Sequence, residues 1–366
     1  MGKKWVTIFE RYEDFHFKKD VGQIPYHANV ILNYEVELWH LGKYNSLTDL
    51  NSFKIRCIKD GNTIFSLNLP IIFRLVKEAK KIDVLTLFHF RKYSLIYASI
   101  FKFLNPTGFV MIKCDANNYE MPFLNQSKIF ERVIKFFAKK IDLLLIEHLS
   151  ILSFFNQYAF KTFYMPNGVS AELYNYAGST LVCKSRSVAE IIFVGKCGDP
   201  RKNAELIIRT LADLPHGLKW RARFYGGQTK EFDNFIEIYR KKPFDFINKI
   251  EFMGFISDAQ ILAKAYAESH IFLMTSHSEG YPLSMIEACW LGCMPILSDR
   301  SGGDDLVACS DGYIYKNEAS LLSILLKSIQ EIESTIDKGK RCQKYVSQNN
   351  DWRINIKKLG DIINNE

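Results

Sequence analysis

The feature that most constrains this fold is a regular alternation of short apolar runs with segments of helical length. In the first half, strands are expected at residues 81–89, 109–114, 143–146 and 163–165, with helices at 71–80, 93–104, 128–140 and 150–159. This pattern predicts βαβ units and a mostly parallel sheet. Ligands of such sheets bind at the carboxyl ends of the strands. The polar residues that close two of these strands, His89 and Asp115, are therefore candidate site residues.

The alternation stops and then restarts. Residues 166–169 read Pro-Asn-Gly-Val, which indicates a turn. Strands are then expected at 190–194, 220–225, 250–253, 271–274 and 295–297, and helices at 204–214, 259–267 and 282–291. A length of 366 residues also favours two domains, at roughly 150 residues each. We predict an N-terminal domain over 1–168, a linker over 169–187 and a second α/β domain over 188–345, with the site in a cleft between the domains.

The net charge of +8 is confined to one half of the chain. Residues 1–165 hold 23 lysines and arginines against 15 acidic residues, whereas residues 166–366 hold 25 of each. A basic half beside a neutral half predicts two domains with different partners, one of them an anionic surface.

Several classes of protein are disfavoured. No run of about 18 apolar residues predicts a membrane-spanning helix, and the apolar run at 5–9 is too short for a signal peptide. The eight cysteines are scattered without a Cys-x-x-Cys pair, which predicts neither a disulfide framework nor a zinc site. We expect reduced thiols in a cytoplasmic protein. No nucleic-acid-binding motif is present, so a nucleic-acid partner is not expected.

Two glutamates stand eight residues apart in the most informative stretch of the sequence. Glu279 follows a buried strand, and Glu287 lies on the helix after it. The backbone amides of Gly280, Tyr281 and Leu283 lie at or near the start of that helix, which is a favourable place for an anion. A carboxylate that accepts sugar hydroxyls beside amides that bind phosphate suits a nucleotide-sugar. The alternative is structural, with Glu279 capping the helix and Glu287 on its surface.

A second candidate site is the loop after the strand at 190–194. It carries Lys196, Arg201 and Lys202 around a glycine, and a helix follows. Three cations there could neutralise a diphosphate without a metal ion. The glycine spacing fits neither a Walker A loop nor a dinucleotide-binding fingerprint. Taken alone, a solvated basic loop is the simpler interpretation.

Together these two patterns resemble the retaining family-four glycosyltransferases of the GT-B fold, among the glycosyl transferases group 1. The spacing of Glu279 and Glu287 matches the Glu-x7-Glu signature of that family, and Lys196 stands where arginine is more usual. Further similarities lie at residues 166–169, 224–227, 252–256 and 295–303. The resemblance implies an α/β, GT-B fold with two Rossmann-like parallel-sheet domains facing across a cleft. It also implies that residues 346–366 form a C-terminal helix that packs back on the N-terminal domain.

The resemblance implies a role for each matched residue. Lys196 and Lys202 would bind the diphosphate, with Arg201 as an alternative to Lys202. Glu279 would hold the donor sugar, together with the Gly280 and Tyr281 amides. Glu287 would take the ribose hydroxyls, and the Ile256 backbone would contact the base. The strand-end histidine, His89, would line the sugar pocket. No Asp-x-Asp pair closes a strand, so neither a metal ion nor another cofactor is expected.

The acceptor side is less well defined by the sequence. Residues 20–23 occupy the place of the family's glycine-rich loop, with Gly22 as its glycine, and Asp115 closes a neighbouring strand. The segment from Lys128 to Lys140 predicts a basic amphipathic helix with Lys128, Arg132, Lys135 and Lys139 on one face. Such a helix can lie on an anionic membrane, although a solvated surface helix has the same pattern. Residues 91–103 show a weaker form of it.

The function that the resemblance implies is a retaining glycosyltransferase. It would move a hexose from a UDP- or GDP-sugar to a lipid-linked or surface glycan, as in lipopolysaccharide, O-antigen or capsule assembly, on the inner face of the membrane. The alternatives are a non-catalytic scaffold that binds nucleotide-sugar and another GT-B enzyme, such as a nucleotide-sugar epimerase. The Glu-x7-Glu pattern disfavours the epimerase, and the intact glutamates and lysines disfavour the scaffold.

Overall fold

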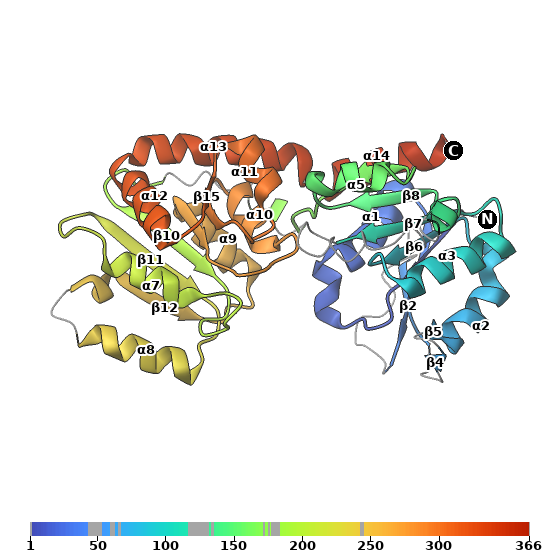
Figure 1. Ribbon diagram of the computed structural model, residues 1–366, viewed down its shortest axis with the longest axis horizontal. Helices are drawn as coiled ribbons and strands as arrows, with labels where there is room; N and C mark the ends of the chain where they lie inside the picture. Colours follow the sequence, from blue (N-terminus) through green and yellow to red (C-terminus); the bar gives the residue numbers. More distant parts are fainter. Residues whose placement is uncertain are drawn as a thin grey trace. The chain divides into compact units, whose positions relative to one another are not determined.

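The structure of the chain, a computed structural model, describes residues 2–42, 53–58, 63–64, 67–115, 132, 135–170, 173–174, 176, 184–241 and 245–365. The chain forms two compact units (Figure 1). Unit 1 comprises Met1–Gly168 and Asp351–Glu366, and unit 2 comprises Val169–Asn350. From the sequence we predicted that the C-terminal segment begins at residue 346. In the structure the boundary between the two units lies after Asn350, directly beyond the end of helix α13 (Ile332–Asn349).

Unit 1 is built on a parallel sheet. Among the described residues it has seven strands in the order β3-β2-β1-β6-β7-β8-β9. Their bounds are β1 (Lys4–Ile8), β2 (Glu35–Leu41), β3 (Phe53–Ile58), β6 (Val84–Phe88), β7 (Phe109–Cys114), β8 (Leu143–Ile146) and β9 (Thr162–Tyr164). A short antiparallel pair, β4 (Thr63–Ile64) and β5 (Leu67–Asn68), lies outside this sheet. Every residue of β6, β7 and β8 is buried, as expected for strands that are covered on both faces.

Helices cover both faces of the sheet in unit 1. One face carries α2 (Leu69–Glu78), α3 (Lys92–Leu104) and α5 (Leu152–Asn156), whose apolar sides share one core with the sheet. Apolar residues of α1 (Asp20–Leu32) and α14 (Trp352–Asn364) belong to a second core. The fully buried Trp352 fits against Gly168, where a Cβ would lie 2.7 Å from the indole ring. The C-terminal helix is therefore an integral part of unit 1.

Short 3-10 helices complete unit 1 at η1 (Asp14–Lys18), η2 (Ala79–Lys81) and η4 (Leu149–Ile151). Residues 20–23 were predicted to take the place of a glycine-rich loop, and this is wrong. They form the first turn of α1. Gly22 serves helix packing there, because a Cβ would overlap the backbone of Phe17.

Unit 2 contains a second parallel sheet. Its described strands run in the order β12-β11-β10-β13-β14-β15. Their bounds are β10 (Ala189–Val194), β11 (Trp220–Tyr225), β12 (Ile250–Gly254), β13 (Ile271–Met274), β14 (Met294–Ser298) and β15 (Tyr313–Tyr315). The helices are α7 (Ala204–Ala212), α8 (Lys230–Arg240), α9 (Ala259–Glu268), α10 (Leu283–Trp290), α11 (Asp304–Ser310), α12 (Glu318–Gln330) and α13, with η5 (Asp245–Lys249) before β12.

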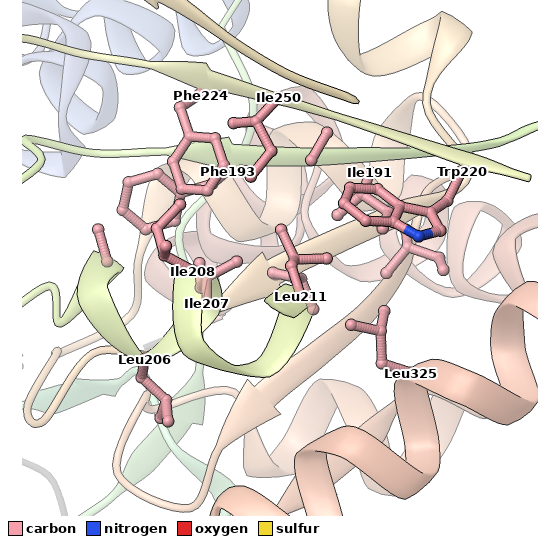
Figure 2. Packing of buried hydrophobic residues seen from close by; sticks show 14 of the residues in the cluster. Ile191, Phe193, Leu206, Ile207, Ile208, Leu211, Trp220, Phe224, Ile250 and Leu325 are labelled. Atoms are coloured by element: carbon pink, nitrogen blue, oxygen red, sulfur yellow. The ribbon is translucent and has the colours of Figure 1, made fainter. Parts of the chain in front are cut away.

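The core of unit 2 forms because α7 has an apolar face. Ile207, Ile208 and Leu211 of this helix are buried and point toward Phe193 and Trp220 of the sheet (Figure 2). The other face of the sheet packs against α9, α10 and α13. The described residues of the predicted linker belong to unit 2, where Val169 and Leu173 are buried in the same apolar cluster as α9, α10 and α13.

Candidate functional site

The loops after three strands of unit 2 are tied to one another. The Gly195 amide donates to the Tyr225 carbonyl (2.8 Å), and the Gly226 amide donates to the Gly254 carbonyl (2.8 Å). Gly226 has a φ of +141°, and a Cβ there would overlap the Gly195 carbonyl. Only glycine permits this close approach, so the loop that bears Lys196 has a defined backbone path.

An ion pair joins two of the predicted site residues. Lys202 Nζ lies 2.6 Å from Glu279 Oε1, and the two side chains are 22% and 18% exposed. Thr275, just after β13, holds the cationic loop in place, because its hydroxyl donates to the carbonyls of Lys202 (2.9 Å) and Asn203 (2.8 Å). The sequence interpretation missed Thr275, although its position directly after a buried strand was a usable signal.

The other two cations of the loop are placed differently. Arg201 pairs with Asp199 at 3.1 Å and is 73% exposed, and Lys196 is exposed. The Arg201 carbonyl accepts a hydrogen bond from the His277 amide (2.7 Å), which ties this loop to the segment that carries Glu279. Of the two candidates for the second cation, Lys202 forms the ion pair with Glu279.

The start of α10 is shaped by its neighbours. Gly280 is exposed, and the carbonyl of Gly280 would overlap any Cβ on Gly302. Tyr281 is buried, and its hydroxyl accepts a hydrogen bond from Asn350 Nδ2 (3.2 Å). Leu283 is the first residue of α10. The loop before this helix is thus held from both sides, while Gly280 remains at the surface.

Glu287 and Ile256 lie elsewhere in unit 2. Glu287, on α10, is half-buried and accepts a hydrogen bond from the hydroxyl of Tyr266 (3.4 Å). Burial and the nearby Glu287 carboxylate raise the pKa of Tyr266 well above its usual value, so this hydroxyl remains a donor. Ile256 follows β12 and packs against the core, next to Phe255, which is 79% exposed.

Unit 1 has its own pocket, of about 910 Å³. It opens at the carboxyl ends of β1, β2 and β6, where ligands of parallel sheets bind. Tyr97 lines it and donates its hydroxyl proton to Glu10 (2.7 Å), and this hydroxyl also accepts from the Asn68 amide (3.0 Å). The remaining lining includes aromatic and charged side chains, among them Phe9, Arg11, Tyr12, Glu13, His89, Arg91 and Tyr93.

His89 and Asp115 are brought together at the edge of the sheet. His89 Nδ1 lies 2.8 Å from Asp115 Oδ2. His89 has a φ of +62°, an uncommon backbone conformation for a residue with a side chain. Burial acts to lower the pKa of His89, but the hydrogen bond and charge of Asp115 outweigh it and raise the pKa overall. Burial acts to raise the pKa of Asp115, and the bond to His89 outweighs it and lowers the pKa.

A buried ion pair lies close to the His89–Asp115 pair. Lys113 Nζ, fully buried in β7, lies 2.9 Å from Glu147 Oε1 and donates to the Met165 carbonyl (2.7 Å). Burial raises the pKa of Glu147 to about 7, and the Lys113 charge opposes this rise. Burial likewise raises the pKa of Asp20, at the start of α1. The sequence interpretation missed this cluster; a lysine inside an apolar strand was the signal.

The structure describes only part of the basic helix predicted over residues 128–140. Lys128 and most of this predicted helix lie outside the described residues, whereas Lys135 and Lys139 are described and exposed.

Nowhere in the described ranges do three His, Cys, Asp or Glu side chains form a group that could hold a metal ion. No helix in the described part of the chain is long and apolar enough to cross a bilayer.

Comparison with known proteins agrees with this architecture. Residues 185–349 match the family model described as glycosyl transferases group 1. Among solved structures, Anabaena HepE in complex with UDP aligns over 100% of both chains, with 14% identity and a TM-score of 0.70. Sucrose-phosphate synthase from Thermosynechococcus elongatus aligns over 99% of this chain and 98% of its own, with 14% identity and a TM-score of 0.69.

A third solved structure is the apo form of the lipopolysaccharide outer core galactosyltransferase WaaB, with 16% identity, 99% coverage of both chains and a TM-score of 0.67. A comparison with curated proteins finds no match. The two parallel α/β units and these full-length structural similarities confirm the predicted GT-B fold. Residues 185–349, just under half of the chain, match the glycosyl transferases group 1, and the whole chain has the fold of the glycosyltransferases with which it aligns.

Proposed function

We propose that this enzyme transfers a hexose from a UDP-sugar to a glycan acceptor with retention of the anomeric configuration. The observation that carries the proposal is the Lys202–Glu279 ion pair in the group 1 domain. In the proposal, Lys202 binds the donor's diphosphate, and Glu279 beside it accepts hydrogen bonds from the donor's sugar hydroxyls. GDP-sugars are the second choice, because solved structures of similar fold include complexes with UDP and UDP-glucose.

Electrostatic stabilisation of the leaving group supplies the main catalytic effect in this proposal. The bond from the anomeric carbon to the diphosphate oxygen breaks, and a bond to the acceptor hydroxyl oxygen forms on the same face. The acceptor proton passes to the departing phosphate oxygen. Lys202 and Lys196 meet the negative charge that develops there, and preorganised charges of this kind are effective because they need no reorientation during the reaction. No metal ion takes part in the proposed step.

The remaining donor contacts belong to unit 2. Glu279 and the Gly280 and Tyr281 amides hold the sugar, with Leu283 at the start of the helix. Glu287 takes the ribose hydroxyls, and the Ile256 backbone contacts the base. Arg201 stays near the diphosphate as an outer charge.

The acceptor binds unit 1 in this proposal. The pocket at the carboxyl ends of β1, β2 and β6 combines aromatic faces with charged groups, which suits a sugar ring and its hydroxyls. His89 and Asp115 lie at this pocket's side of the sheet, whereas Gly22 acts through the packing of α1. The acceptor is a lipid-linked or surface glycan, which places the enzyme at the cytoplasmic face of a membrane, as in lipopolysaccharide assembly.

The test compares nucleotide-sugar turnover by the wild type, Glu279→Gln and a control, Glu237→Gln. Glu237 is an exposed glutamate on α8, ion-paired with Arg240. We expect Glu279→Gln to lower kcat about a hundredfold or more, because it removes a charge at the reacting sugar, and the control to match the wild type. The same assays with EDTA should give unchanged rates. Wild-type protein that turns over no nucleotide-sugar from a full panel, with its natural acceptor supplied, would contradict the proposal.

A thermal-shift screen identifies the base. A nucleotide that binds only the folded protein raises the unfolding temperature by mass action. We expect UDP to give a larger shift than GDP or ADP at equal concentration. Equal shifts, or none, would contradict the choice of UDP.

A further inference from the structure

Two phenylalanines on neighbouring helices of unit 1 project into solvent. Phe73 of α2 is 74% exposed and Phe103 of α3 is 84% exposed. Near the end of α3, Asn105 Nδ2 donates to the carbonyls of Ala79 (3.0 Å) and Ile82 (2.9 Å), which lie just beyond the end of α2. The two helices therefore lie side by side (Figure 1).

The helix α2 is apolar on two faces. Ile71 and Leu75 are fully buried in the core, so one face already has its partner. Leu69, Phe73 and Val76 stand on another face, at a spacing of four and then three residues, with exposures of 38%, 74% and 53%. Folding of unit 1 does not account for this second apolar face.

Lysines continue the exposed apolar face. Lys77 follows Phe73 by one turn of α2, and Lys80 and Lys81 lie in η2 just beyond the end of this helix; all three are exposed. Within the described ranges none of the three has an ion-pair partner, whereas nearby Glu78 is paired with Lys4 and Arg74. We call the set Leu69, Phe73, Val76, Lys77, Lys80, Lys81 and Phe103 the α2–α3 surface.

We propose that the α2–α3 surface binds an anionic lipid bilayer. Phenylalanine side chains bury in the boundary between headgroups and acyl chains, while lysines reach the anionic headgroups. A row of apolar side chains with uncompensated lysines matches this environment in both polarity and charge. Of the nearby acidic side chains, Glu78 is paired with Lys4 and Arg74, and Asp142 is paired with Lys102, so these two carboxylates do not offset the charge of the three lysines.

This surface differs from the one that the sequence suggested. Of the weakly predicted stretch 91–103, Tyr97 and Phe101 are buried and belong to the core, so only Phe103 of its aromatic residues is strongly exposed. At the described end of the predicted basic helix, Phe136 is 59% exposed, and Lys135 and Lys139 are exposed as well. Its neighbour Phe137 packs against the same core as α2 and α3. The inference rests on the proposed membrane location and assigns it a surface.

The test is co-sedimentation with vesicles of phosphatidylcholine containing 40% or no phosphatidylglycerol. One variant carries Phe73→Ser and Phe103→Ser, and its control carries Ile238→Ser and Ile261→Ser, two exposed isoleucines of unit 2. A second variant carries Lys77→Glu, Lys80→Glu and Lys81→Glu. Its control carries Lys241→Glu, Lys357→Glu and Lys358→Glu, three exposed lysines elsewhere, so the net charge is matched. Circular dichroism checks that each variant is folded.

We expect the wild type and both controls to bind the anionic vesicles. Each α2–α3 variant should need about tenfold more lipid for half-maximal binding. Three results would overturn the inference: no binding by the wild type, unchanged binding by both α2–α3 variants, or equal losses in variants and controls. Donor hydrolysis without vesicles should be unchanged in every variant. Failure of the proposed function would instead remove donor hydrolysis from all proteins and leave vesicle binding as it is.

Discussion

Thr275 illustrates how a residue without charge can control a charged site. Its hydroxyl donates to the carbonyls of both Lys202 and Asn203. Asn203 has a φ of +50°, so the loop turns sharply there before α7 begins. The position of the Lys202 ammonium beside Glu279 depends on this anchored backbone.

Thr275→Val should therefore weaken donor binding while leaving the fold intact. Valine keeps the shape and removes the donor, and loss of about 1 kcal/mol per hydrogen bond corresponds to a rise in the Kd for UDP of about fivefold to thirtyfold. Calorimetric titration measures it. The control is Thr210→Val, because Thr210 donates to Leu206 inside α7; its Kd should equal that of the wild type. A Kd in Thr275→Val equal to that of the control would contradict the role of Thr275.

The His89–Asp115 dyad gives a prediction with a defined sign. The Asp115 carboxylate raises the pKa of His89, so the imidazolium persists to a higher pH than usual. Asp115→Asn keeps a hydrogen-bond acceptor and removes the charge. The pKa of His89 should fall, measured by NMR titration of its ring, and the alkaline limb of kcat/KM should move to lower pH in parallel. Asp361→Asn, an exposed change on α14, should move neither. An unchanged His89 titration would exclude this coupling.

At the scale of elements, neighbouring strands are linked by polar groups inside an apolar sheet. Lys113 of β7 is fully buried and pairs with Glu147, just beyond β8. A buried pair of this kind adds little net stability, yet removal of one partner is costly because the other charge is left unpaired.

A double-mutant cycle on this pair tests that reasoning. Lys113→Met and Glu147→Leu should each lower the free energy of unfolding by about 3–5 kcal/mol, whereas the double variant should lose much less than the sum. Urea unfolding measures all four proteins. The exposed Asp337–Lys340 pair on α13 is the comparison, and its coupling should be far smaller. Additive losses at Lys113 and Glu147 would show that the two groups are independent.

At the scale of the whole molecule, acid should weaken both units through buried histidines. Burial lowers the pKa of His27 and His148 in unit 1, and of His270 in unit 2, to about 4 in each case. Between about pH 4 and pH 6.5 the unfolded chain binds more protons at these sites than the folded chain. The contribution of these three histidines to stability is therefore full above pH 6.5 and is lost as the pH drops toward 4.

His27→Gln should reduce this acid sensitivity. The fall in the free energy of unfolding between pH 7 and pH 5 should be smaller in the variant than in the wild type, whatever its stability at pH 7. Urea titrations at several pH values give the slopes. His216→Gln, at an exposed histidine of unit 2, should keep the wild-type slope. Identical slopes in His27→Gln and the wild type would contradict the assignment.

An element of this fold was predictable from the sequence when the way it buries its side chains leaves a local pattern. Strands such as β7, β8 and β10 were predictable because strands covered on both faces read as continuous apolar runs. Strands β2 and β3 were missed because they carry charges that tertiary contacts compensate. Glu37 of β2, for example, pairs with Lys4 (3.1 Å) and accepts from the Trp39 indole (2.8 Å). Helix α1 was missed because Gly22 and Pro25 oppose helix formation locally.

The sequence by itself determined the α/β class, the group 1 match of residues 185–349 and the list of candidate site residues, because strand periodicity and motif spacing are local properties. The tertiary structure decided which of the candidate residues contact one another. It joined Lys202 with Glu279 across 77 residues and His89 with Asp115 across 26. It also buried Lys113 and left Phe73 and Phe103 exposed. These outcomes depend on which strand ends and helix faces become neighbours, and that order follows from packing of the whole sheet rather than from any local run of residues.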